Sequence, residues 1–270
     1  MKNVATLIAA GLLLVGCKDQ GNEKNKMMND TLAENNAEMS QTPFQETMDL
    51  KIEPISHATA VFKWGDKTFY TDPVGGAEAF KGKDRPDFIL ITDIHGDHMN
   101  AETLKAIGLD SVTVIVPQAV KDKLPADLKA EYIVMNNGDS KELMGFNIQA
   151  IPMYNLPQSK DAMHVKGRGN GYIIENNGKR LYISGDTEDI PEMRNLKNID
   201  VALVSMNLPY TMPVDRAAKG VLAFTPKKVI PYHYRGKNGL SDVEEFKKLV
   251  NEGNSDIEVE LMNWYPERSK

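Results

Sequence analysis

Four potential metal ligands directly follow a short apolar run at residues 88–92, and they are Asp93, His95, Asp97 and His98. The run is typical of a buried strand, and Asp93 and His95 can point in the same direction if the extended backbone continues beyond it. A glycine before Asp97 permits a sharp turn, which would aim the second pair of side chains from another direction. Because imidazole and carboxylate are usual ligands of zinc and related ions, the stretch predicts a metal site at the end of a strand. The alternative is a solvated loop after a buried strand.

The other candidate ligands are far apart in the sequence but share one position, the end of an expected strand. All five histidines of the chain follow or adjoin such an end, and those outside the first stretch are His57, His164 and His233. Asp72 and Asp186 follow apolar runs in the same way. Each histidine alone could be structural. Because α/β folds usually place their sites at the ends of strands, the whole set predicts one shared site.

Residues 48–270 are predicted to form one α/β domain, because short apolar strands alternate with helical segments. Strands are expected at residues 52–55, 58–64, 67–71, 88–92, 111–116, 132–135, 146–151, 171–175, 180–184, 201–206, 229–232 and 257–261. Helices are expected at residues 101–107, 118–124, 190–196, 214–224 and 242–251. No linker rich in proline, serine or charge interrupts this pattern.

The first 47 residues are predicted to precede the folded domain. Residues 1–17 resemble a bacterial lipoprotein signal peptide: a lysine, an apolar segment too short to span a bilayer comfortably, and a lipobox that ends at Cys17. Cys17 is the only cysteine and the predicted lipidation site; the alternative is an ordinary secretory signal peptide. Residues 18–47 contain few β-branched or aromatic residues, which predicts a flexible tether. We therefore expect a protein of the bacterial cell envelope, anchored by lipid to either membrane and periplasmic or surface-exposed.

The composition and net charge indicate which kinds of ligand the protein binds. The hydrophobic fraction of 41% is sufficient for a sizeable core, and the formal net charge of −6 argues against general binding to nucleic acid. Export from the cytoplasm argues against ATP- or NAD-dependent chemistry. A small molecule is the expected substrate, and the sequence leaves the oligomeric state open.

The order of the motifs resembles that of the metallo-β-lactamase superfamily. The motifs are Asp93-x-His95-x-Asp97-His98, a later His164, Ser184-Gly185-Asp186-Thr187 and Pro231-Tyr232-His233-Tyr234. Three further segments are similar to the branch that includes ascorbate-6-phosphate lactonase-like proteins: His57-Ala58-Thr59 before Thr71-Asp72-Pro73, the segment 167–172, and the segment 208–212. One position departs from the family, since its first motif usually begins with histidine and this chain has Asp93.

The resemblance implies an αββα sandwich with a dinuclear metal centre at one edge of the two sheets. By position, Asp93, His95 and His164 would hold one ion, and Asp97, His98 and His233 the other, with Asp186 as the bridge. The ions would be two divalent cations, zinc first and manganese or iron as alternatives. A hydroxide that bridges them would be the nucleophile, and Asp97 would orient it and could accept its proton. The harder oxygen donor at Asp93 leaves the metal open and makes the loss of one ion an alternative.

Residues around the expected ligands have softer roles. His57 and Asp72 are predicted to orient ligands rather than to bind metal, although His57 could equally be structural. Cationic side chains near the motifs could hold a phosphate or carboxylate of the substrate, and a tyrosine could donate a hydrogen bond; the alternatives are solvated charges and a packed ring. These candidates are Lys166, Arg168, Arg235 and Tyr210.

The function predicted from these features is metal-dependent hydrolysis of a small ester, lactone or phosphodiester at the cell envelope. The alternative is a non-catalytic lipoprotein that retains the fold in order to bind metal or a ligand. Asp93 is the residue that favours this alternative.

Overall fold

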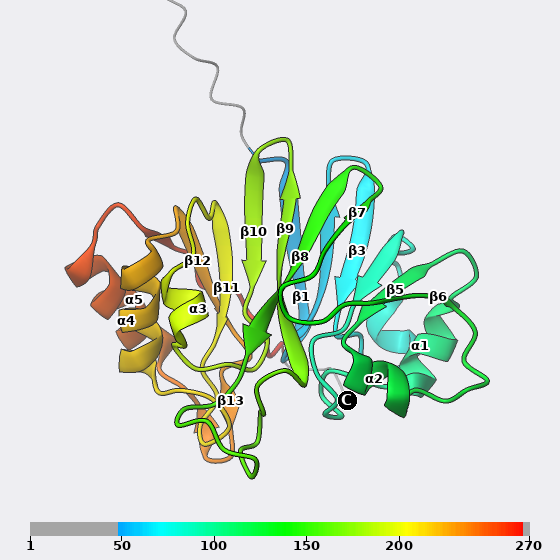
Figure 1. Cartoon of the computed structure of the whole chain (residues 1–270). Coiled ribbons are helices and arrows are strands. Elements are labelled where there is room, and N and C mark those ends of the chain that lie inside the picture. Colours follow the sequence, from blue (N-terminus) through cyan, green and yellow to red (C-terminus); the bar gives the residue numbers. More distant parts are fainter. Residues whose placement is uncertain (1–47, 267–270) are drawn as a thin grey trace, which may run out of the picture. The chain divides into compact units, whose positions relative to one another are not determined.

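The computed structural model describes residues 48–266, which form two stacked β-sheets with helices on their outer faces (Figure 1). The predicted signal peptide at 1–17, its lipidation site Cys17, and the predicted tether at 18–47 lie outside the described residues. Among the described residues, no helix has both the length and the apolar character needed to cross a membrane.

The first sheet contains six strands in sequence order. They are β1 (Leu50–Ser56), β2 (Thr59–Trp64), β3 (Lys67–Thr71), β4 (Phe88–Leu90), β5 (Thr113–Val116) and β6 (Glu131–Val134). The first three are antiparallel, whereas β3 to β6 run parallel. Helices α1 (Ala101–Ile107) and α2 (Gln118–Lys123) pack on the outer face through one apolar cluster, and a 3-10 turn spans Ala77–Phe80.

The second sheet contains seven strands in the order β15, β12, β11, β10, β9, β8, β7. Their bounds are β7 (Ser140–Leu143), β8 (Phe146–Met153), β9 (Gly169–Asn176), β10 (Lys179–Ile183), β11 (Val201–Ser205), β12 (Lys228–Tyr232) and β15 (Glu258–Val259). Strands β10, β11, β12 and β15 are parallel, and the remaining pairs are antiparallel. The outer helices are α3 (Pro191–Arg194), α4 (Val214–Phe224) and α5 (Val243–Gly253), and a small hairpin joins β13 (Arg235–Gly236) to β14 (Gly239–Leu240).

Strand β4 shows how the sequence builds the two layers. Phe88 and Leu90 belong to the core between the sheets, whereas Ile89 and Ile91 belong to the cluster beneath α1 and α2. A strand that is buried on both faces reads as a continuous apolar run, as is usual for parallel sheets. Between the sheets, Phe69 stacks on its register neighbours Phe62 and Phe88 with ring centroids 4.7 and 4.8 Å apart.

The predicted α/β sandwich is confirmed, and the helices at 101–107 and 214–224 have the predicted bounds. Other details of the prediction differ from the structure. Strand β4 ends at Leu90, not at residue 92, because the N–H of Thr92 donates to the side chain of Asp72 at 2.7 Å instead of to a backbone carbonyl of a neighbouring strand. The edge strand β7 was missed because its charged sequence Ser-Lys-Glu-Leu lacks an apolar alternation, and the hairpin β13–β14 is too short to give a pattern. The segments expected at 190–196 and 257–261 contain shorter elements, α3 and β15.

Helix α1 begins directly after the ligand-rich stretch, and its N-cap fixes where that stretch ends. Oδ1 of Asn100 accepts hydrogen bonds from the N–H and the hydroxyl of Thr103, at 2.7 and 2.9 Å. We expect Asn100→Ala to lower the free energy of unfolding by about 1 kcal/mol, because it leaves an N-terminal N–H of the helix without its acceptor. Denaturant unfolding of the metal-free protein measures this effect. Asn100→Asp is the matched control and should lose much less; equal losses would show that the cap contributes nothing.

Candidate metal centre

All seven predicted metal ligands lie in loops at one edge of the sandwich. His95 and its neighbours follow β4, His164 lies between β8 and β9, Asp186 follows β10, and His233 follows β12. The carboxyl ends of the parallel strands in both sheets meet at this edge, so the side chains converge although they come from positions 93 to 233. The geometry therefore brings together the predicted set.

The first group consists of Asp93, His95 and His164, whose candidate ligand atoms lie within 4.8 Å of one another. Nδ1 of His95 is 2.5 Å from Oδ2 of Asp93, and Nε2 of His164 is 3.9 Å from the same oxygen. The extended backbone does not continue to His95, because the chain bends after Asp93. The condition under which Asp93 and His95 would point in the same direction along a strand is therefore not met. The two side chains meet across this bend instead.

The second group consists of Asp97, His98 and His233, again with ligand atoms within 4.8 Å of one another. Oδ2 of Asp97 lies 3.3 Å from Nε2 of His233, and its Oδ1 lies 3.8 Å from Nε2 of His98. The two imidazole nitrogens are only 3.2 Å apart. The side chain of Asp97 is 43% exposed, whereas both histidines are buried, so Asp97 is the member that opens to solvent.

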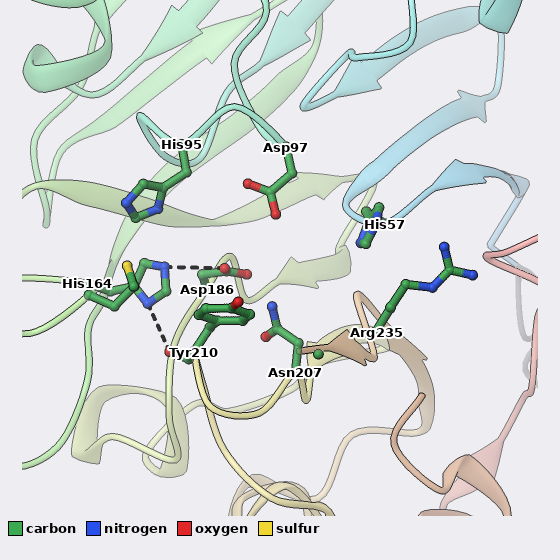
Figure 2. Close-up of a pocket in the computed structure, with 10 residues that line it drawn as sticks. His57, His95, Asp97, His164, Asp186, Asn207, Tyr210 and Arg235 are labelled. Carbon is green, nitrogen blue, oxygen red and sulfur yellow. Dashed lines mark hydrogen bonds and ion pairs between the residues drawn. The ribbon is translucent and has the colours of Figure 1, made fainter. Parts of the chain in front are cut away.

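Asp186 lies between the two groups (Figure 2). Its Oδ2 is 3.3 Å from Nε2 of His164 and 3.4 Å from Nε2 of His98. Its Oδ1 is 3.4 Å from Nε2 of His233. One carboxylate thus faces a histidine of the first group and both histidines of the second, which is the position that a bridging ligand requires.

The donor atoms fit divalent cations. Oδ1 of Asp93, Nε2 of His164 and Oδ1 of Asp186 are buried without a well-aligned hydrogen-bond partner among the residues that the structure describes. Buried polar atoms are normally satisfied, and each exception calls for an explanation such as an ion. The imidazole nitrogens of His98 and His233 are also so close together that a proton or a cation must lie between them. Nitrogen and carboxylate donors in this number suit zinc, manganese or iron.

The charges of the metal-free site are those of a cation-binding cluster. Burial opposes ionisation of Asp186, but the charges of His233 and His98 outweigh it and hold its pKa well below the usual value. Burial also opposes the charged form of His98, yet the carboxylates of Asp186 and Asp72 raise its pKa well above the usual value. The same carboxylates that favour a positive charge on His98 would favour a bound cation. Metal binding at such a site releases protons, because a ligating histidine must be neutral.

Asp72 lies behind His98, on the side away from the other ligands. Its Oδ2 accepts a hydrogen bond from Nδ1 of His98 at 2.8 Å and from the hydroxyl of Thr92 at 2.6 Å. Burial raises the pKa of Asp72, and the contacts with His98 and Thr92 act in the opposite direction. A carboxylate bound to Nδ1 fixes the ring orientation and leaves Nε2 to face an ion. Asp72 thus stands where a residue that orients His98 would stand, with a left-handed backbone (φ 44°) that marks local strain.

His164 is held by residues that the sequence did not indicate. Its N–H donates to Oδ1 of Asn155 at 2.7 Å, and its Nδ1 is 3.2 Å from the carbonyl oxygen of Tyr210. The side chain of Asn155 donates to the same carbonyl at 2.8 Å. Tyr210 therefore contacts His164 through its backbone carbonyl, whereas the sequence predicts a role for its hydroxyl. Asn207 similarly lies 3.5 Å from Nδ1 of His233.

The three candidate cations have different surroundings. Nζ of Lys166 is 2.6 Å from the carboxylate of Glu192 and lies over the ring of Tyr154. Arg168 faces Asp93, with Nε 3.4 Å from Oδ1 and Nη2 3.4 Å from Oδ2. Only Arg235 among them lines the cavity above the two groups.

That cavity has a volume of about 340 Å³, which is in the range of small-ligand sites. Its lining residues are His57, His95, Asp97, Met163, His164, Asp186, Asn207, Tyr210, Arg235 and Gly236. His57 packs edge-on against the ring of His233, with centroids 5.2 Å apart, and its Nδ1 is 3.4 Å from the hydroxyl of Tyr265. Burial and the neighbouring His233 lower the pKa of His57 to about 4.

Comparison with known proteins gives the family. The family model described as the beta-lactamase superfamily domain matches residues 51–233. The chain belongs to the metallo-β-lactamase superfamily. Over 217 residues it is 33% identical to a UPF0173 metal-dependent hydrolase of Pyrococcus abyssi, an alignment that covers 74% of this chain and 92% of the relative. The resemblance seen in the motifs is thereby confirmed at the level of the superfamily.

Two solved structures of similar proteins agree with this assignment. A protein from Parabacteroides distasonis, assigned as a metal-dependent hydrolase, shares 35% identity with a TM-score of 0.70, covering 80% of this chain and 94% of that one. A metallo hydrolase from Ignicoccus hospitalis shares 25% identity with a TM-score of 0.66, covering 79% and 94%. The prediction that this superfamily member is a metallo-hydrolase agrees with the names of these relatives.

Proposed function

We propose that the chain hydrolyses a small ester, lactone or phosphodiester with a two-ion centre, zinc being the first choice of metal and manganese or iron the alternatives. The observation that carries this proposal is Asp186, whose two oxygens face histidines of both ligand groups at 3.3–3.4 Å. A site for a single ion would not need a carboxylate in that position. The metal-dependent hydrolases among its relatives support the same reaction class.

Bound divalent ions would supply a hydroxide nucleophile at neutral pH and would polarise an oxygen of the scissile group. In the reaction, the oxygen of water bonds to the acyl carbon or phosphorus, and the bond from that atom to the leaving oxygen breaks. Asp97 is the half-exposed carboxylate in the cavity, and it is positioned to accept a hydrogen bond from the water. Burial opposes its ionisation, but the hydrogen bond with His233 and the charge of His98 lower its pKa well below the usual value of an aspartate. Asp97 is therefore ionised and would orient the water by accepting a hydrogen bond from it, and the proton that the water loses ends on the leaving oxygen.

Two narrower parts of the proposal rest on the sequence. The similarity of His57-Ala58-Thr59, of the segment 167–172 and of the segment 208–212 to lactonase-like proteins favours a lactone or another cyclic ester. The lipobox ending at Cys17 favours action at the bacterial cell envelope, where a tether would keep the domain near a membrane.

The alternative function is non-catalytic binding of metal or a ligand by the same fold. Asp93 is the observation that favours it, because Arg168 lies within 3.4 Å of both its oxygens and competes for the carboxylate that the first ion would use.

Metal removal and reconstitution separate the two functions. We expect the full chain to bind close to two equivalents of zinc or manganese, to lose turnover completely after dialysis against a chelator, and to regain it when the ion is restored. Elemental analysis gives the metal content, and 4-nitrophenyl acetate, a γ-lactone and bis(4-nitrophenyl) phosphate serve as substrates. One equivalent or none, without turnover on any of the three, would refute the hydrolase and leave the binding protein.

A further inference from the structure

Arg235 is the one cation among the cavity's lining residues. Within the described part of the chain, no carboxylate lies within 4.0 Å of its guanidinium, whereas Lys166 and Arg168 each have a carboxylate neighbour. A cation that faces a substrate cavity without a protein counter-ion is available to an anionic group of a ligand. Its charge also has no role in holding the ligand groups together.

The backbone around Arg235 keeps the side chain in place. Its N–H donates to the hydroxyl of Tyr265 at 2.9 Å, and its guanidinium lies 4.1 Å from the centroid of the same ring. The next residue, Gly236, packs so closely on the loop after β11 that a Cβ atom there would fall 1.9 Å from the carbonyl oxygen of Leu208. These contacts favour one position of the side chain over the ring of Tyr265, which reduces the entropic cost of binding a ligand there.

The cavity differs between its two ends. Figure 2 shows His95 and His164 at one end and His57 and Arg235 at the other, with Asp97 and Asp186 between them. Met163, which is 48% exposed and precedes His164, adds apolar surface at the His164 end. A substrate whose reacting group lies at the ions would therefore reach Arg235 with the part that extends away from His164.

We propose that the substrate carries a second, non-reacting anionic group, a carboxylate or a phosphate, which Arg235 binds. This inference rests on the proposed two-ion hydrolase, because the ions define where the reacting group lies. Arginine suits the task, since its planar fork pairs with both anions in a bidentate manner. Such a substrate would be a small anionic ester or lactone rather than a neutral one.

Ligands of equal length test this assignment without any turnover. Butyrate, succinate and 3-phosphonopropionate share one carboxylate and differ at the far end, which is a methyl, a carboxylate or a phosphonate. Isothermal titration of the metal-loaded full chain should show about tenfold tighter binding of one or both doubly anionic ligands than of butyrate. Arg235→Gln should remove most of this gain. Lys237→Gln is the matched control, because it removes a positive charge two residues away that does not line the cavity.

Each outcome decides the proposal. A gain that is lost in Arg235→Gln and kept in Lys237→Gln supports it, and the stronger of the two ligands distinguishes carboxylate from phosphate. No gain in the parent protein, or an equal gain in Arg235→Gln, overturns it. If the gain depends on Arg235 but no ester, lactone or phosphodiester is hydrolysed, then the anion site stands and the proposed hydrolase fails. Metal content measured after each titration shows whether the ligands have stripped the ions.

Discussion

An Asp186→Ala variant is expected to retain at most one divalent ion and to lose at least about a hundredfold in affinity for the other. Residues that merely orient ligands change metal affinity by about 10- to 100-fold, and a carboxylate shared by two ions should have a larger effect. The variant also leaves the buried His98 and His233 without the anion that faces both of them at 3.4 Å. Hydrolytic turnover should fall to the background rate. Elemental analysis after equilibrium dialysis, together with turnover at saturating metal, measures both effects.

Two companion variants separate a bridging role from a loss of folding. Asp186→Asn keeps the size of the side chain but removes its charge. This variant should fold, yet it should still bind one of the two ions poorly. Asp161→Ala is the matched control, because this exposed aspartate lies in the loop that carries His164 and has no ion-pair partner among the described residues. Circular dichroism of the metal-free forms shows whether each variant is folded. Retention of both ions by Asp186→Ala at unchanged affinity would contradict the bridging assignment.

The fold and the candidate ligands could be predicted because each has a signal in its own stretch of sequence. Phe88 to Ile91 reads as a strand buried on both faces, and the structure places its alternate side chains in two separate apolar clusters. His233 directly follows a similar run at β12, and Asp186 follows β10 after Ser184 and Gly185. Strands of this kind end at one edge of the sandwich, so a histidine or aspartate just beyond a strand end is placed at that edge.

The partners of those ligands could not be predicted, because their contacts join loops that have no common pattern. Asn155 binds His164 and the carbonyl of Tyr210, residues that are 9 and 55 positions away. Asparagine is common in loops, and nothing distinguishes this one before the chain is folded. The same holds for the cations: Lys166, Arg168 and Arg235 are equivalent in sequence, and only their neighbours Glu192, Asp93 and Tyr265 give them different roles.

The second large effect is expected at Asp93, the position at which this chain departs from its family. Asp93→Ala should reduce the bound ions from about two to one, because it leaves His95 and His164 as the only remaining members of the first group. Asp97, His98 and His233 are untouched, so the second group should keep its ion at near-normal affinity. Titration with zinc against a competing chelator resolves the two binding events. Loss of both ions, or of neither, would contradict a separate first site that depends on Asp93.

Arg168 supplies the test of why an aspartate can stand there. The charges of Asp93 and Arg168 cancel, so the pair has the same net charge as the neutral histidine that is usual at this position in the family. However, the guanidinium lies within 3.4 Å of both carboxylate oxygens, and it competes with an ion for them. Arg168→Met should therefore strengthen binding at the first group by about tenfold, or about 1.4 kcal/mol. In an Asp93→His background the arginine has no carboxylate to compete for, so the same substitution should change the affinity little. Equal gains in both backgrounds would mean that Arg168 acts only as a distant positive charge and that Asp93 binds the first ion without competition.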